Sequence, residues 1–392
     1  MRELRAQVDA VLDGAVDLRR TLHAEPELAG DEVGTTAIVR ERLRSLGLEE
    51  LRCPTPTGAV FRLEGGRPGR TVLLRADIDA LPLEEETALP FRSRVPGVMH
   101  ACGHDGHAAA LLGAAEVLAR RAPDLAGRVV LLFQPAEETG EGARAMLDGG
   151  VLAGLGVERV AGLHLSSNLP TGLVMARPGI AMATFQRFTI RLRGTGGHAA
   201  LAAGDGNVVL AAAELARRLP ALLDGLELAE TPCVCGTGVL RAGTVHNVIP
   251  RDAEIGGSLR TFTAEQHPEG VARLRTACEA VAAEFGVSAA VDLPRPVPAV
   301  VNDPSATAVT REALAAVLGP SSVLEAPPMT PSDDVSEFLL RAPGCYFFVG
   351  SRPGPRIPPQ HHAPDFDFDE QALRVAMISL VAAAEALAAR QG

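Results

Sequence analysis

The chain has 392 residues, of which 47% are hydrophobic and 22% are charged, and its formal net charge is −11 at pH 7. This composition is typical of a soluble globular protein, and the length suggests roughly two domains of ~150 residues each. The negative charge and the absence of a run of five basic residues argue against nucleic acid or an anionic membrane as the main partner.

Lysine does not occur in the chain, so all 37 basic residues are arginine. This excludes chemistry that needs a lysine, such as a Schiff base, pyridoxal phosphate attachment or a P-loop. Neither a G-x-S-x-G motif nor a complete G-x-G-x-x-G motif is present. Their absence disfavours serine hydrolases of the elbow type and Rossmann oxidoreductases.

The N-terminus is charged from the start and lacks the apolar core of a signal peptide. The sequence also lacks a continuous apolar run of the ~18 residues that a membrane span requires. The six cysteines include no C-x-x-C pair and suggest no disulfide framework. We therefore expect a cytoplasmic protein with reduced thiols and no membrane association.

Helical and strand-like patterns alternate along the first part of the chain. The strand-like runs are short and apolar, as expected for strands buried on both faces of a largely parallel sheet. Strands that alternate with helices predict an α/β domain. The expected helices are 3–22, 32–46, 106–121 and 142–149, and the expected strands are 59–63, 71–74, 128–133 and 160–165.

The pattern changes after about residue 180, where residues 185–193 alternate polar and apolar as in an antiparallel strand with one wet face. The predicted order that follows is β-α-β-β-α-β, the ferredoxin-like arrangement. We expect residues 184–296 to form a small α+β lid or dimerisation domain, inserted into a catalytic domain of residues 1–183 and 297–392. The remaining elements are strand-like or helical runs at 207–219, 237–240, 252–261, 264–285, 289–292, 304–318, 345–349 and 369–390.

The segment Met99–His107 concentrates potential metal ligands, because three of the ten histidines and one cysteine fall within it. Cys102 and His104 lie two residues apart, so in an extended segment both side chains point the same way. Sulfur and nitrogen donors suit zinc, manganese or cobalt better than calcium or magnesium. The segment could instead be a polar loop whose side chains only cap a helix, without a functional role. A cysteine nucleophile paired with a histidine is the second functional interpretation.

The second cluster is Phe133–Glu138, which ends a predicted buried strand with two glutamates. In open α/β sheets, sites form outside the carboxyl ends of the strands. One of the residues Glu137 and Glu138 can bind a metal while the other acts as general base on water. Taken alone, a solvated acidic loop is the simpler interpretation.

Three further segments carry weaker candidate ligands. His164 ends an apolar strand-like run, Asp77 and Asp79 end another, and His361 and His362 are adjacent late in the chain. Each is weak on its own, since a lone histidine on a strand is more often a hydrogen-bonded core residue. Their coincidence at strand ends and loops favours a two-metal hydrolytic site.

Several motifs follow one another in an order that resembles a known family. The chain is similar to the N-acyl-amino-acid amidohydrolases, including hippurate hydrolase and the auxin-conjugate amidohydrolases, within the aminoacylase and carboxypeptidase G group of metallopeptidases. The resemblance runs nearly end to end. The segments that carry it are Leu22–Leu28, Leu74–Pro82, Met99–His107, Phe133–Glu138, Gly162–His164, Gly196–Ala200, Asn247–Pro250, Gly257–Thr261 and His362–Glu370.

The resemblance implies a role for each matching residue. Two divalent ions per subunit would be bound by Cys102, His104, Glu138, His164 and His362. Glu137 would be the base that activates water and then protonates the leaving amine, and Asp77 would support the site from behind. His198 of the insert would stabilise the oxyanion, often from across a dimer, and Asn247 and Arg260 would hold the substrate. Zinc is the expected metal, with manganese, cobalt and nickel as alternatives.

The chain departs from the family pattern in three places. The residues after Gly-His-Ala-Ala read Leu201–Ala203 where the family usually has a Pro-His pair, and Asp334 lies in a segment that usually reads Glu-Asp-Phe. His361 and His362 compete for the last ligand position, and His362 keeps the family spacing to Pro364. His100 and His107 are interpreted as supporting or capping residues.

The expected reaction is metal-dependent hydrolysis of the amide bond of an N-acyl amino acid, such as a hippurate-like or N-acetyl compound. The products are a carboxylic acid and a free amino acid, and the expected assembly is a homodimer or a higher homo-oligomer. A metallo-dipeptidase or carboxypeptidase, another amidase such as an N-acetyl-diaminopimelate deacetylase, and a non-catalytic metal-dependent binding protein remain as alternatives.

Overall fold

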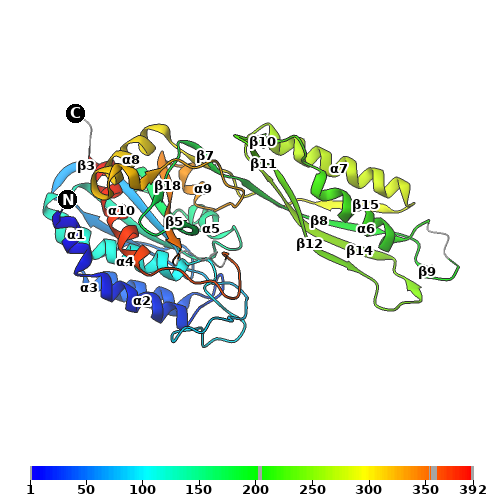
Figure 1. Cartoon of the computed structure of the whole chain (residues 1–392), viewed down its shortest axis with the longest axis horizontal. Coiled ribbons are helices and arrows are strands. Elements are labelled where there is room, and N and C mark those ends of the chain that lie inside the picture. The colour runs from blue at the N-terminus through cyan, green and yellow to red at the C-terminus, as the bar shows by residue number, and fades with distance from the viewer. Residues whose placement is uncertain (1, 202–204, 353, 355–359, 390–392) are drawn as a thin grey trace. The chain divides into compact units, whose positions relative to one another are not determined.

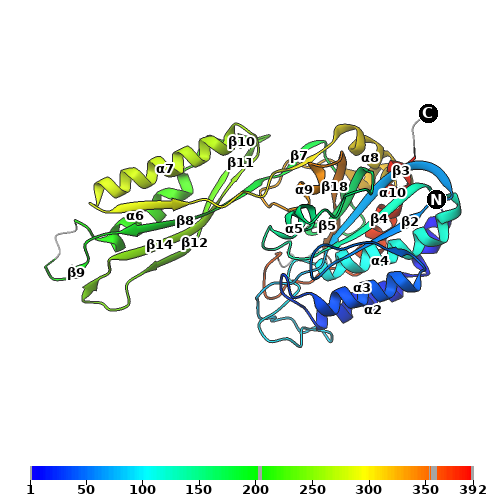
Figure 2. The same cartoon turned by 180° about the vertical axis from the view of Figure 1, so that it is seen from behind.

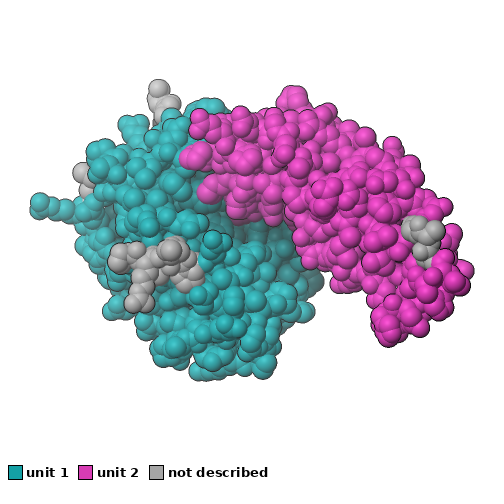
Figure 3. Space-filling view, turned by 45° about the vertical axis from the view of Figure 1, so that its right-hand side comes forward, with its two compact units in different colours: residues 1–179, 301–326, 334–392 teal, residues 180–300, 327–333 magenta. Residues whose placement is uncertain are grey.

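The computed structural model describes residues 2–201, 205–352, 354 and 360–389. They form two compact units, coloured separately in Figure 3: Met1–Gly179, Val301–Ala326 and Asp334–Gly392 in unit 1, and Ile180–Val300 and Pro327–Asp333 in unit 2. The domain boundaries expected from the sequence differ from these by four residues at each end (184 against 180, and 296 against 300). They also leave out Pro327–Asp333, a short segment with no strand or helix pattern of its own.

Unit 1 is built on an eight-stranded sheet with the order β1-β2-β4-β3-β5-β18-β6-β17 (Figure 1). The central strands β4, β3, β5 and β18 are parallel. Antiparallel pairs are β1 with β2, β2 with β4 and β6 with β18, while the edge strand β17 runs parallel to β6. The sheet is therefore mixed, and the expectation of a mostly parallel sheet describes only its centre. The strands are β1 (Glu49–Glu50), β2 (Ala59–Glu64), β3 (Arg67–Asp77), β4 (Ala126–Gln134), β5 (Val157–Pro170), β6 (Val174–Met175), β17 (Val323–Leu324) and β18 (Gly344–Arg352).

Helices cover both faces of this sheet, which makes unit 1 a three-layer α/β structure (Figure 2). The larger core lies under α1 (Arg2–Asp9), α2 (Leu12–Ala24), α3 (Val33–Ser45), α4 (His104–Arg121), α8 (Pro304–Leu318) and α10 (Gln371–Ala388). The smaller core lies under α5 (Gly142–Asp148) and α9 (Ser336–Leu339). The single helix expected over 3–22 is interrupted at Ala10 and Val11; α1 packs on both α10 and α4, and α2 packs mainly on α4.

Within the described part of the chain, α10 is the one helix long and apolar enough to cross a membrane. Its most apolar window is 78% buried inside unit 1, where it packs against α4 and α8. That is the setting of a central core helix.

Unit 2 has its own sheet, with the strand order β12-β14-β8-β15 and antiparallel pairing throughout. The helices α6 (Val208–Arg218) and α7 (Gln266–Glu284) close a separate hydrophobic core against this sheet. Its sheet strands are β8 (Thr184–Arg193), β12 (Val234–Ala242), β14 (Asp252–Thr261) and β15 (Ser288–Asp292). Its short pairs are formed by β9 (Gly197–His198) with β13 (Val248–Ile249) and by β10 (Glu227–Leu228) with β11 (Thr231–Pro232), while β7 (Gly179–Met182) pairs with β16 (Val300–Asn302).

Three parallel strands bring chemically active residues to one edge of the unit 1 sheet. Asp77 is the last residue of β3, Gln134 ends β4 just before the two glutamates, and His164 lies on β5. Helix α4 starts at His104, after Gly103 turns the chain with φ 91°. Any residue with a side chain would be strained in this backbone conformation at position 103. The glycine therefore lets the Cys102 segment turn directly into the helix.

Candidate metal centre

Cys102, His104 and Glu138 form the centre of the site. Each offers one ligand atom, and these atoms all lie within 4.8 Å of one another. Cys102 and His104 are buried and Glu138 is half-buried. The structure thus brings together the segment before α4 and the glutamate loop after β4, as the strand-end argument predicts.

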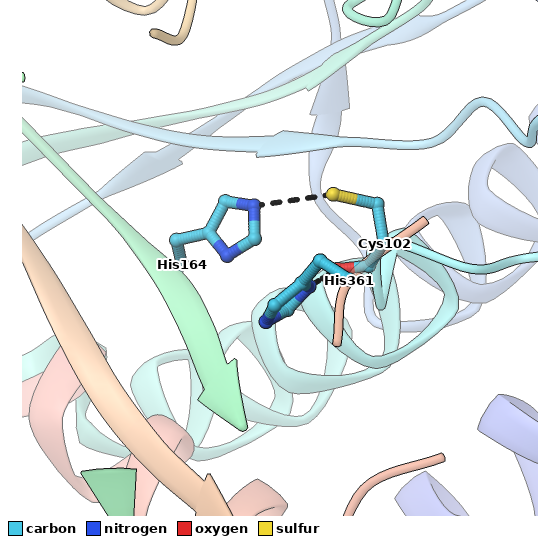
Figure 4. Close-up of side chains that lie close together, drawn as sticks. All are labelled: Cys102, His164 and His361. Carbon is cyan, nitrogen blue, oxygen red and sulfur yellow. Dashed lines mark hydrogen bonds between the residues drawn. The ribbon is translucent and has the colours of Figure 1, made fainter. Parts of the chain in front are cut away.

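His164 also contacts the cysteine. Its Nε2 is 3.5 Å from Cys102 Sγ, and Figure 4 shows this contact together with the neighbouring ring of His361. The His164 Nδ1–H donates to the backbone carbonyl of Leu165 at 2.6 Å. Because a carbonyl only accepts, this bond leaves the Nε2 lone pair of a neutral imidazole directed at Cys102.

Hydrogen bonds fix the ring of His104 in the same way. Its Nδ1–H donates to the backbone carbonyl of Asp79 at 2.9 Å, which leaves Nε2 as the free donor atom for a metal. His107 differs, because its Nδ1–H donates to Asp77 at 2.5 Å and its Nε2 accepts from the backbone N–H of Leu165 at 2.9 Å. Both ring nitrogens of His107 are therefore engaged, in agreement with a supporting position.

The two adjacent histidines near the end of the chain are placed differently. His361 Nδ1–H donates to the Cys102 carbonyl at 3.2 Å, and its Nε2 accepts from the N–H of Ser167 at 3.3 Å. His362 Nε2 lies 3.4 Å from Glu138 Oε1, and its ring is half-exposed. His361 could ligate together with Cys102 and His164 only by giving up one of its hydrogen bonds.

Two buried polar atoms at the centre have no hydrogen-bond partner among the described residues: His104 Nε2 and Glu138 Oε1. Burial of such atoms costs free energy unless a partner satisfies them. Burial also lowers the pKa of His104, but Asp77, Cys102 and Asp79 outweigh it and raise that pKa well above its usual range. The surroundings of His104 Nε2 thus favour a positive charge, and the donor set fits a bound divalent cation.

Glu137 and Asp77 flank this centre. Glu137 Oε2 lies 3.9 Å from His104 Nε2, and Asp77 Oδ2 lies 3.7 Å from the same atom. Burial would raise the pKa of Asp77, but Arg75, His104 and His107 together hold it well below its usual value. Asp77 therefore contributes a fixed negative charge from inside the sheet, whereas the half-buried Glu137 can reach a substrate.

Two residues that organise the centre were given no role from the sequence, although Asp79 was noted as an acid at a strand end. Asp79 Oδ2 accepts the Glu138 N–H at 2.9 Å, and its Oδ1 lies 3.2 Å from His104 Nδ1. Arg75 is fully buried and bonds Asp77 at 2.6 Å and Asp334 at 3.1 Å. The paired acids at the end of β3 were the visible signal for Asp79. The contact between Arg75 and Asp334 joins β3 to a segment 259 residues later and has no local pattern.

A second buried network lies behind α4. Asp105, next to His104, accepts hydrogen bonds from Arg19 at 3.0 Å and His23 at 2.8 Å. Burial would lower the pKa of His23, but its hydrogen bonds to Asp105 and Glu85 raise it to about 9. His23 is therefore a charged imidazole at neutral pH, and it ties the first helices of the chain to the start of α4.

Unit 2 carries the three other residues implicated by the family resemblance. His198 and Asn247 are exposed neighbours, since His198 pairs with Val248 and the Ala199 N–H donates to the Asn247 carbonyl at 3.1 Å. Arg260 lies at the opposite end of the sheet, paired with Phe185. Its Nη1 donates to the Thr330 carbonyl at 3.1 Å, and burial lowers its pKa with no carboxylate contributing.

Thiol, imidazole and carboxylate donors beside a glutamate, gathered at the strand ends of an α/β sheet, define a metal-dependent hydrolase. The chain belongs to the peptidase family M20/M25/M40, which matches residues 73–386. This confirms the resemblance drawn from the motifs, and it makes the protein a metal-dependent enzyme of the amidohydrolase and peptidase class.

Characterised relatives carry different activities in their names. An N-acyl-L-amino acid amidohydrolase of Geobacillus stearothermophilus is 42% identical over 66% of this chain and 70% of its own. Thermostable carboxypeptidase 1 of Saccharolobus solfataricus is 36% identical over 97% of this chain and 96% of its own. The crystal structure of the Bacillus subtilis YXEP protein, described as a dinuclear metal-binding peptidase of family M20, has 34% identity and a TM-score of 0.80 and covers 96% of this chain and 98% of its own.

The charged His23 has a testable effect on stability. Its pKa in the folded protein, about 9, lies above the ordinary value of 6.5 that the unfolded chain has, so its stabilising contribution is complete below pH 6.5 and is lost as the pH rises through about 9. A His23→Gln variant should lose on the order of 3 kcal/mol of unfolding free energy near pH 6, and much less near pH 10. Urea denaturation of metal-free protein at several pH values measures this, with the exposed His246→Gln as control. A difference in unfolding free energy between the His23→Gln variant and the unmodified chain that does not shrink with rising pH would contradict this prediction.

Proposed function

We propose that the protein hydrolyses the amide bond of N-acyl amino acids, of the hippurate or N-acetyl type, to a carboxylic acid and a free amino acid. The observation that carries this proposal is the position of Glu137, half-buried beside the unpartnered donor atoms of His104 and Glu138. Relatives named as an N-acyl amino acid amidohydrolase and as an N-acetylcysteine deacetylase support the same substrate class.

Two divalent ions are proposed to bind to Cys102, His104, Glu138, His164 and His362. The geometry supports this set because His104 Nε2 is unpartnered among the residues described, His164 Nε2 faces Cys102 Sγ at 3.5 Å, and His362 Nε2 faces Glu138. His361 is set aside as a ligand because both of its ring nitrogens are hydrogen-bonded. Zinc is the expected ion, with manganese, cobalt and nickel as alternatives, since sulfur and imidazole donors accept all four.

The bound ions would supply a Lewis acid that polarises the amide carbonyl and makes water a better nucleophile near neutral pH. Glu137 then accepts the proton of the attacking water and passes it to the nitrogen of the leaving amino acid. Asp77, locked by Arg75 and His107, keeps its negative charge and supports the site from behind. His198 donates a hydrogen bond to the oxyanion, a contribution typically worth ~10²–10³ in turnover.

Arg260 is proposed to bind the free carboxylate of the substrate, with Asn247 as a second contact. Half-buried Arg260 receives no carboxylate from the described residues and interacts with two neutral oxygens and with the Phe185 ring at 4.8 Å. A guanidinium in this state offers a bidentate partner for an incoming carboxylate. This would favour substrates with a free α-carboxyl group.

The geometry of unit 2 supports a homodimer or higher homo-oligomer. Arg260 and the end of the sheet next to His198 are separated by eight residues along β14, from Asp252 to Arg260, or about 27 Å of strand. Figure 1 shows β9 at the end of this sheet away from β10 and β11. An N-acyl amino acid is far shorter, so a substrate held by Arg260 of one chain would take its His198 from the partner subunit. The exposed edge strand β12 offers open backbone groups for such an assembly.

One other function is kept as an alternative, and a second is disfavoured. A metallo-carboxypeptidase or dipeptidase would use the same residues, and the carboxypeptidase names of two Saccharolobus solfataricus relatives favour it specifically. A cysteine hydrolase is disfavoured, because burial and the Glu138 charge raise the pKa of the Cys102 thiol well above its usual value.

We further propose a cytoplasmic location, in agreement with six free cysteines, and no nucleic-acid or membrane partner.

The reaction is tested by release of free amino acid from a panel of N-acetyl amino acids, N-benzoyl amino acids and dipeptides, with chelator and with added metal. We expect metal-dependent release, fastest from the N-acyl compounds. Glu137→Gln should lower kcat by ~10²–10⁴ with the bound metal retained, because only the proton acceptor is removed. The nearby Glu141→Gln serves as control. Faster cleavage of dipeptides would favour the peptidase, and no release with any metal would refute the proposal.

The dimer is tested by mixing two inactive variants, Glu137→Gln and His198→Ala, under conditions that exchange subunits. If His198 acts on the partner's site, each mixed dimer contains one site with both residues intact. Random pairing then restores about a quarter of the activity of the unmodified chain. If His198 acts within its own chain, every site lacks one residue and the mixture stays inactive.

A further inference from the structure

The loop that carries the two glutamates is held in an unusual backbone conformation. Ala136, immediately before Glu137, has φ 55°, in the left-handed region that residues with a side chain rarely adopt. Such a conformation persists only where the surroundings impose it. The contacts of this turn therefore show what holds Glu137 in place.

The strongest contact comes from Glu32, at the start of α3. Its side chain is fully buried, its Oε1 accepts the Ala136 N–H at 2.8 Å, and its Oε2 accepts the Thr57 hydroxyl at 2.7 Å. A buried carboxyl group is stable only when its oxygens are hydrogen-bonded. One of the two side-chain hydrogen bonds of Glu32 is thus made to a backbone group of the loop that carries Glu137 and Glu138.

The other side of Glu137 is held by a second carboxylate. Asp79 accepts the N–H of Glu138 at 2.9 Å. The backbone N–H groups of the residues before and after Glu137 therefore both donate to acidic side chains. The Ala136 carbonyl accepts from the Thr139 hydroxyl at 3.0 Å and from the Gly142 N–H at 3.1 Å. Three backbone groups next to Glu137 are therefore fixed: the N–H and carbonyl of Ala136 and the N–H of Glu138.

We propose that Glu32 is a positioning residue for Glu137: by accepting the Ala136 N–H, it holds the left-handed turn that aims the Glu137 carboxylate at the substrate. This inference rests on the proposed role of Glu137 as the base. In this role of Glu32, the N-terminal segment, which contributes none of the candidate ligands, helps to position the base. Glu32 reaches the glutamate loop on one side of the centre while His23 reaches Asp105 on the other.

Glu27 provides a matched control, because it lies in the same segment and also accepts two hydrogen bonds. Its oxygens bind the N–H groups of Gly34 at 2.7 Å and Thr35 at 2.8 Å, so it caps α3 and does not touch the glutamate loop. The Glu32 side chain makes no hydrogen bond to the start of α3 and bonds the loop instead. Each variant removes a carboxylate that accepts two hydrogen bonds, and only the Glu32 variant removes one to the loop.

The experiment compares kcat, KM and bound metal in metal-loaded Glu32→Ala, Glu32→Gln and Glu27→Ala. Glu32→Ala should lower kcat by ~10²-fold at unchanged KM and metal content, because a displacement of about 1 Å is enough for such a loss. Glu32→Gln should recover most of kcat, since its amide oxygen can accept from Ala136 while its amide nitrogen donates to Thr57. Glu27→Ala should keep kcat close to that of the unmodified chain.

A second substitution tests the backbone strain itself. Glycine adopts positive φ without a steric cost, so Ala136→Gly in the Glu32→Ala background should restore part of the lost kcat. If Glu32→Ala does not fold, Glu32→Met replaces it, because its side chain is similar in length and cannot accept the Ala136 hydrogen bond. If the loss of kcat in the double variant equals the product of the losses in the two single variants, Glu32 and Ala136 are not coupled and the proposal is contradicted.

Amide hydrogen exchange of the segment 134–141 gives a readout that does not depend on activity. Glu32→Ala should accelerate exchange there and Glu27→Ala should not. Unchanged exchange in Glu32→Ala, or equal losses of kcat in the Glu27 and Glu32 variants, would overturn the proposal. A fully active Glu137→Gln variant would instead refute the proposed function, and the exchange data would still decide whether Glu32 holds the loop.

Discussion

The structure of unit 1 depends on one electrostatic constraint: several electron-rich groups are buried together at the carboxyl ends of parallel strands. Cys102, His104 and Glu138 approach within 4.8 Å of one another, with Asp77 just behind them. Such a cluster is unfavourable without compensating positive charge. Arg75 supplies part of it from inside the sheet, and the unpartnered atoms His104 Nε2 and Glu138 Oε1 mark where a cation fits.

Around this centre, the chain devotes many residues to holding others in place. His107 locks Asp77, Asp79 fixes both the ring of His104 and the backbone of Glu138, and Glu32 holds Ala136. These supports come from strand ends, helix starts and the first helices of the chain. A mobile residue would lose the alignment on which proton transfer depends, and each of these contacts removes one degree of freedom.

The sequence predicts the elements that have strong local patterns. The Ala-rich helix α4, the apolar strands β4 and β5, and the polar-apolar alternation of β8 all lie within a few residues of their expected bounds. The short edge strands β1, β6 and β17 have two residues each, too few to show periodicity, and the mixed character of the sheet was missed with them. Among the site residues, Cys102, His104 and Glu138 could be found because their types and spacing are chemically distinctive. Arg75 and Glu32 could not, because an arginine within a strand and a glutamate before a helix are ordinary until the fold brings them to Asp334 and Ala136.

The most direct test of the central claim is anomalous diffraction at the zinc edge from crystals of the zinc-loaded protein. The account predicts two peaks about 3.5–4 Å apart, bound by Cys102 Sγ and His104 Nε2 at distances of ~2.0–2.3 Å. Glu137 should lie beside them without bonding either ion. A single peak, or ions bound at Asp77 and His107 with Cys102 left free, would contradict it.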